Sequence, residues 1–110
     1  MACPASLPEK NTGRIQEVLL MVCRKHISFY GWVQGVGFRY RARYAADRME
    51  CTGWVKNEYD GSVTMEIQGT EEAIDQVIRE IAGGRYVRIE DIRVRNLPVD
   101  PDERRFRVKS

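Results

Sequence analysis

The chain reads Gly31-Trp-Val-Gln-Gly-Val-Gly-Phe-Arg39 at the junction between two segments whose apolar residues have different periods. Before it, Ile27 and Phe29 alternate with polar residues, which predicts a half-buried strand over residues 25–33. After it, apolar residues recur at helical spacing, which predicts a helix over residues 38–50. The junction is therefore a glycine-rich loop between a strand and the start of a helix.

This loop has the composition of an anion-binding site. Gly35 and Gly37 favour positive φ and leave the neighbouring peptide N–H groups accessible to a ligand. A helix that starts near Phe38 directs its unpaired N–H groups and positive dipole end at the same point. Arg39 adds a planar guanidinium that matches two oxygens of a phosphate or carboxylate. The alternatives are a plain glycine turn and a solvated first-turn arginine.

Composition limits the classes of function. The chain has 110 residues, 43% of them hydrophobic, which indicates one domain. Its formal net charge of +2 permits an anionic small-molecule ligand but does not argue for a nucleic-acid-binding protein. Three cysteines at unpatterned spacings predict neither a disulfide framework nor a zinc site, so we expect a cytoplasmic protein without a metal. The only histidine, His26, excludes multi-histidine metal sites and His-dependent triads within this sequence. No apolar run is long enough to cross a membrane.

The elements predicted along the chain define a fold class. Residues 1–22 are expected to be an N-terminal extension, flexible or a short helix or strand, and residues 23–110 the folded domain. After the first strand and helix, the patterns predict strands over residues 53–57, 62–68, 86–97 and 105–108, and a second helix from Thr70 to Gly83. The order is that of an α+β, ferredoxin-like split βαβ (βαββαβ) sandwich. Its antiparallel sheet carries both helices on one face, and an extra edge strand is accommodated.

The predicted topology places Asn57 near the glycine loop. In the split βαβ arrangement the first and third strands are central neighbours, and the second strand pairs beside the third. Asn57 ends the second strand and is therefore expected close to the loop. On its own, however, Asn57 is better explained by the simpler role of setting up the turn before Asp60-Gly61.

Two motifs resemble those of a known family. The segment Gly31–Arg39 closely resembles the first signature of the acylphosphatases. Gly53-Trp-Val-Lys-Asn57, followed by Asp60-Gly-Ser-Val63 and Gly69, resembles the second. The resemblance extends in element order from about Lys25 to Val108. It implies hydrolysis of small acyl phosphates to a carboxylate and inorganic phosphate.

The resemblance also implies roles for individual residues. Arg39 would bind the phosphoryl group and Asn57 would orient the attacking water. The phosphate cradle would consist of the backbone N–H groups of Gln34, Gly35, Val36, Gly37 and Phe38. Phosphoryl transfer depends mainly on positioning and preorganised donors, so neither a metal nor another cofactor is expected. The expected partners are an acyl phosphate, and inorganic phosphate or a similar anion at the loop; a monomer without nucleic-acid or membrane partners is expected.

The sequence departs from the usual pattern of the family at two positions. Where relatives usually have a glycine near the end of the first helix, this chain has Glu50, so either Glu50 occupies a strained cap or the helix ends differently. The tail Phe106–Ser110 lacks the terminal tyrosine of many relatives.

A non-catalytic module that binds RNA or a phosphorylated ligand is an alternative function, because residues 35–38 loosely resemble an RNA-binding signature. A carbamoyl-phosphate domain, as in large multidomain maturation factors, is another.

Overall fold

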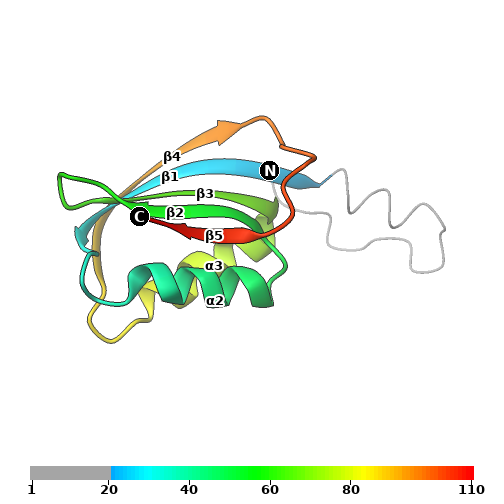
Figure 1. Cartoon of the computed structure of the whole chain (residues 1–110). Coiled ribbons are helices and arrows are strands. Elements are labelled where there is room, and N and C mark those ends of the chain that lie inside the picture. Colours follow the sequence, from blue (N-terminus) through cyan, green and yellow to red (C-terminus); the bar gives the residue numbers. More distant parts are fainter. Residues whose placement is uncertain (1–20) are drawn as a thin grey trace.

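Two helices pack on one face of a five-stranded sheet in the computed structural model, which describes residues 21–110 (Figure 1). The strands are β1 (Val22–Trp32), β2 (Thr52–Asn57), β3 (Val63–Thr70), β4 (Arg88–Leu97) and β5 (Phe106–Lys109), and the helices are α2 (Phe38–Arg48) and α3 (Glu71–Ala82). Within this range no helix is long and apolar enough to span a membrane. The structure expected for residues 1–20 of the extension lies outside the described residues.

The sheet has the strand order β4-β1-β3-β2-β5. β1 and β3 are the central antiparallel neighbours, β2 lies beside β3, and β4 pairs antiparallel with β1. This order confirms the predicted ferredoxin-like βαββαβ fold. β5 is the additional edge strand, and it pairs parallel with β2, so the complete sheet is mixed and not wholly antiparallel.

The predicted apolar faces form the core. Ile27 and Phe29 of β1 are fully buried, as is Met65, which pairs with Ile27 across the β1–β3 ladder. On α2, three buried alanines let the helix pack closely: Ala42, Ala45 and Ala46. α3 begins as its sequence predicts, because Thr70 Oγ1 accepts a hydrogen bond of 3.2 Å from the Ala73 N–H.

Glu50 occupies the strained cap that the sequence left as one of two alternatives. Its φ is 59°, and it is the only residue other than glycine with positive φ among residues 21–110. The Cys51 N–H donates to the Ala46 carbonyl (2.8 Å) and the Glu50 N–H to the Asp47 carbonyl (3.2 Å). These are the two hydrogen bonds of a Schellman motif, whose left-handed position favours glycine. α2 therefore ends in a left-handed cap without a glycine, at a conformational cost.

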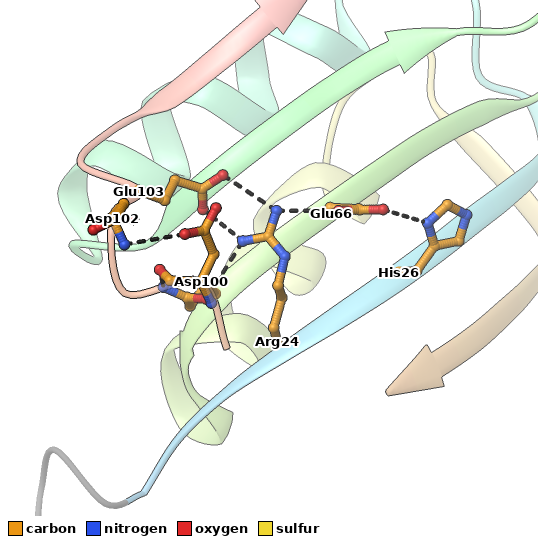
Figure 2. A network of polar contacts seen from close by, with 7 residues as sticks. Arg24, His26, Glu66, Asp100, Asp102 and Glu103 are labelled. Atoms are coloured by element: carbon orange, nitrogen blue, oxygen red, sulfur yellow. Dashed lines mark hydrogen bonds and ion pairs between the residues drawn. The ribbon is translucent and has the colours of Figure 1, made fainter. Parts of the chain in front are cut away.

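A charged network on the sheet face away from the helices fixes the connection between β4 and β5 (Figure 2). Buried Arg24 binds both carboxylate oxygens of Glu103, at 2.7 and 3.2 Å, and also Glu66 at 3.0 Å. The hydrogen bonds with Glu103 raise the pKa of Arg24 although burial opposes this. Gln68 accepts from the Asp100 N–H (2.7 Å) and donates to the Asp100 carbonyl (2.9 Å). The connection that leads into β5 is thus held by side chains of β1 and β3.

Glu66 is the middle member of this network. Its second carboxylate oxygen lies 2.9 Å from Nδ1 of His26 (Figure 2). Although burial alone would raise it, hydrogen bonds with His26 and Arg24 hold the pKa of Glu66 below its usual value. The carboxylate therefore stays ionised and paired at neutral pH.

Candidate active site

The glycine loop has the backbone conformation that its composition predicts. Gly35 and Gly37 have φ of 73° and 80°, in the left-handed region that favours glycine. A Cβ at either position would meet no protein atom within 4 Å, so no packing contact requires glycine there. The space beside both residues is open, and a ligand can approach the backbone.

The start of α2 lacks a side-chain cap, in contrast to α3. Gly37 is the N-cap of α2 and no side chain accepts a hydrogen bond from the first turn. At α3 the Thr70 hydroxyl fills this role. The first-turn N–H groups of α2 are therefore available to an anion, and the positive end of the helix dipole favours one.

Gln34 joins the glycine loop to the turn after β2. Its Nε2 donates to the carbonyl of Glu58 (2.7 Å) and to that of Ser62 (2.8 Å). Within the turn, the Glu58 N–H donates to the Ser62 carbonyl at 2.9 Å, which closes the β2–β3 hairpin just beyond Asn57. The sequence predicted only a backbone role for Gln34. The sequence offered one signal for the side-chain role, an amide with two N–H donors within the glycine loop. Its partners could not be predicted, because they are backbone carbonyls, which no side-chain pattern identifies.

Arg39 is held from the far edge of the sheet. Its Nη1 donates to the Lys109 carbonyl of β5 at 3.0 Å. No other hydrogen bond or ion pair of Arg39 forms within residues 21–110, and its guanidinium has five donors. The remaining donors are available to a ligand, while the contact with β5 restricts the orientation of the side chain.

One small pocket brings the two predicted catalytic side chains together. It has a volume of about 150 Å³ and is lined by Gly35, Gly37, Phe38, Arg39 and Asn57, with Val33 and Tyr40. Asn57 thus reaches the loop, as the topology predicted. Two other predicted cradle residues have side chains elsewhere: Gln34 contacts the hairpin turn, and Val36 packs against the core and lines a neighbouring pocket.

A hollow larger than this pocket is also present. It measures about 910 Å³ and lies along α3, at the end of β3. Its lining includes four carboxylates, from Glu50, Glu72, Asp75 and Glu80, and one arginine, Arg79. The four carboxylates repel an anionic substrate, so selecting the active site by hollow volume alone would give the wrong location in this protein.

Other reactive side chains lie away from the pocket. Burial raises the pKa of the Cys51 thiol to about 11, so it is protonated and unreactive at neutral pH. His26 is bound to Glu66 on the open face of the sheet. Among residues 21–110, no group of three or more histidine, cysteine, aspartate or glutamate side chains is arranged to hold a metal ion.

The residues that loosely resemble an RNA-binding signature do not have the corresponding position. Residues 35–38 form the loop and the first residue of α2. An RNA-binding domain of this fold presents its aromatic residues from central strands. Trp32 and Tyr40 are 71% and 61% exposed and therefore do not belong to the core.

The fold and the pocket together define a class: a small α+β domain with a pocket lined by a glycine loop, one arginine and one asparagine. Comparisons with known proteins identify the family. The acylphosphatase family model matches residues 25–108. An acylphosphatase of Geobacillus thermodenitrificans is 42% identical over 86 residues, 77% of this chain and 92% of the relative. The chain belongs to the acylphosphatase family, enzymes that hydrolyse acyl phosphates.

Solved structures agree with this assignment. The crystal structure of acylphosphatase from Bacillus subtilis matches with a TM-score of 0.73 and 32% identity, over 80% of this chain and 99% of that one. Full-length HypF in its phosphate- and nucleotide-bound form matches with a TM-score of 0.69 and 28% identity, but over only 12% of its length. The similarity to HypF is therefore confined to one part of that larger protein.

Proposed function

We propose that the chain cleaves the carboxyl–phosphate bond of small acyl phosphates, with Arg39 binding the phosphoryl group and Asn57 orienting the water. The observation that carries this proposal is the shared pocket of Arg39, Asn57 and the two left-handed glycines. A cradle of N–H groups from residues 34–38 supplies donors on one side of the phosphoryl group, and the guanidinium supplies them on another.

The reaction needs little acid or base assistance from the protein. The water oxygen forms a bond to phosphorus, and the bond from phosphorus to the acyl oxygen breaks. The carboxylate leaves with the electron pair, and a proton of the water passes to a phosphate oxygen. Because a carboxylate is a good leaving group, the neutral amide of Asn57 suffices to hold the water without deprotonating it.

Charge stabilisation is the main contribution of the protein. In the loose transition state, negative charge spreads over the equatorial phosphate oxygens. Amide donors that are already oriented and a guanidinium held by β5 stabilise this charge without reorganising. The hydrogen bond from Arg39 to the Lys109 carbonyl keeps the guanidinium at the pocket.

Two measurements on the full chain test this function. Steady-state hydrolysis of benzoyl phosphate establishes the activity, and a titration of the isotopically labelled protein with inorganic phosphate locates the anion by nuclear magnetic resonance. We expect the largest amide shifts at residues 34–38 and little change along α3. Shifts concentrated at the hollow along α3, or no hydrolysis above background, would contradict the proposal.

A further inference from the structure

Two hollows adjoin the pocket of Arg39 and Asn57, here called the phosphate pocket, and each shares a different lining residue with it. One, of about 410 Å³, shares Asn57 with it and is lined also by Lys56, Glu58 and Tyr59. The other, of about 490 Å³, shares Gly35 with it and reaches the connection between α3 and β4. That connection lies beside the glycine loop at the same end of the sheet (Figure 1).

The geometry of phosphoryl transfer distinguishes these hollows. The attacking and leaving oxygens lie roughly in line through phosphorus, so the acyl group lies on the side opposite the water. If Asn57 holds the water, the hollow that contains Asn57 lies on the attacking side. The acyl group then extends toward the hollow that shares Gly35. This step rests on the function proposed above.

Aromatic and aliphatic side chains line this second hollow. Trp32 and Tyr86 are 71% and 69% exposed, so their rings are open to a ligand. Val36 and Val87 also line the hollow and are partly buried against the core. The aromatic and valine side chains thus offer apolar surface to the carbon skeleton of an acyl group.

The same hollow carries two unpaired cations. Arg85 and Arg88 both line it, and none of the lining residues is acidic. Within residues 21–110 neither arginine forms an ion pair, and the Arg85 guanidinium lies 6.0 Å from the ring centroid of Tyr86. A guanidinium without a carboxylate partner beside an apolar hollow favours an anionic group on the ligand.

We propose that the hollow formed by Trp32, Val36, Arg85, Tyr86 and Arg88 is the acyl subsite, and that it selects acyl phosphates whose acyl group carries a second negative charge. The carbon skeleton contacts the aromatic and valine side chains, and the distal anion pairs with the two arginines. Phosphate binding by the glycine loop is common to all acyl phosphates; selectivity among them arises at this subsite.

A matched pair of substrates tests the proposal: benzoyl phosphate and 4-carboxybenzoyl phosphate. The ratio of their kcat/KM values, measured first for the wild type, is compared with the same ratio for the double variant Arg85→Gln/Arg88→Gln. This comparison cancels the intrinsic difference in reactivity between the substrates. Because exposed ion pairs are individually weak, we expect a modest effect. In the double variant, the kcat/KM for 4-carboxybenzoyl phosphate relative to that for benzoyl phosphate is expected to fall about three- to tenfold, mainly through a higher KM for the carboxylated substrate.

A charge-matched control separates the subsite from a general field effect. Arg104 and Arg105 are exposed and do not line this hollow, so Arg104→Gln/Arg105→Gln is expected to keep the wild-type ratio. An unchanged ratio in the Arg85→Gln/Arg88→Gln variant, or an equal loss in the control variant, would overturn the subsite while leaving the hydrolytic function intact. Failure of the wild type to hydrolyse either substrate would instead count against the proposed function itself.

Discussion

Gln34 shows how one side chain fixes the distance between two halves of a site. It belongs to the glycine loop, yet both of its hydrogen bonds end on the turn that follows Asn57. The position of Asn57 relative to the loop therefore depends on the Gln34 amide. In the function proposed above, Asn57 orients the water and the loop N–H groups bind phosphate, so the Gln34 side chain is expected to affect the first and not the second.

Replacing Gln34 by methionine tests this dependence. The variant Gln34→Met keeps the length of the side chain but removes two hydrogen bonds to half-buried carbonyls, so we expect a stability loss of about 1–3 kcal/mol. We expect kcat for benzoyl phosphate to fall by about tenfold or more with phosphate affinity nearly unchanged, since misplacement of a reacting group costs rate. Urea unfolding and product inhibition by phosphate measure the two effects.

The control for this substitution is Gln76→Met on α3. Within residues 21–110, the side-chain hydrogen bonds of half-buried Gln76 go to Glu80 and Arg79 of the same helix. It is expected to leave both stability and kcat close to the wild-type values. A Gln34→Met enzyme with unchanged kcat would show that Asn57 keeps its place without the amide.

At the scale of whole elements, the C-terminal cap of α2 combines regular hydrogen bonds with an unfavourable backbone conformation. Its two Schellman hydrogen bonds form although Glu50 has to adopt a left-handed conformation. A non-glycine residue there costs roughly 1–2 kcal/mol. The surrounding contacts of α2 and β2 thus impose a cap that the sequence itself disfavours.

Glycine at position 50 relieves this cost. For Glu50→Gly we expect an increase of about 1 kcal/mol in the free energy of unfolding, measured by urea titration, since the hydrogen bonds stay and the strain is removed. Activity is expected to stay the same because Glu50 lies outside the phosphate pocket. Glu50→Ala is the comparison, because alanine retains the steric conflict; equal stabilisation by both substitutions would contradict the explanation.

The position of β5 in the sheet is a feature that sequence patterns do not predict. Local signals predicted all the strands, including a short one over residues 105–108, and both helices. The parallel pairing of β5 with β2 follows instead from the long connection held by Arg24 and Gln68. Its contribution to the site is the Lys109 carbonyl, which no side-chain pattern encodes.

At the scale of the whole molecule, the sheet brings three distant segments to one pocket. The loop after β1 supplies the amides, the end of β2 supplies Asn57, and the end of β5 orients Arg39. The split βαβ topology made the proximity of Asn57 predictable from the sequence, because β1 and β2 flank β3. The approach of Arg85 and Arg88 to Gly35 was not predictable, since it depends on the path of the α3–β4 connection.

The most direct test of the central claim compares Arg39→Ala with Asn57→Ala in one assay of phosphate affinity and benzoyl phosphate turnover. We expect Arg39→Ala to weaken phosphate binding and to lower kcat/KM by about 10³-fold, because its charge stabilises both bound phosphate and the transition state. Asn57→Ala is expected to lower kcat by about 10²-fold while phosphate binds as to the wild type. A large loss of phosphate affinity in Asn57→Ala, or unchanged affinity in Arg39→Ala, would contradict the division of roles within this pocket.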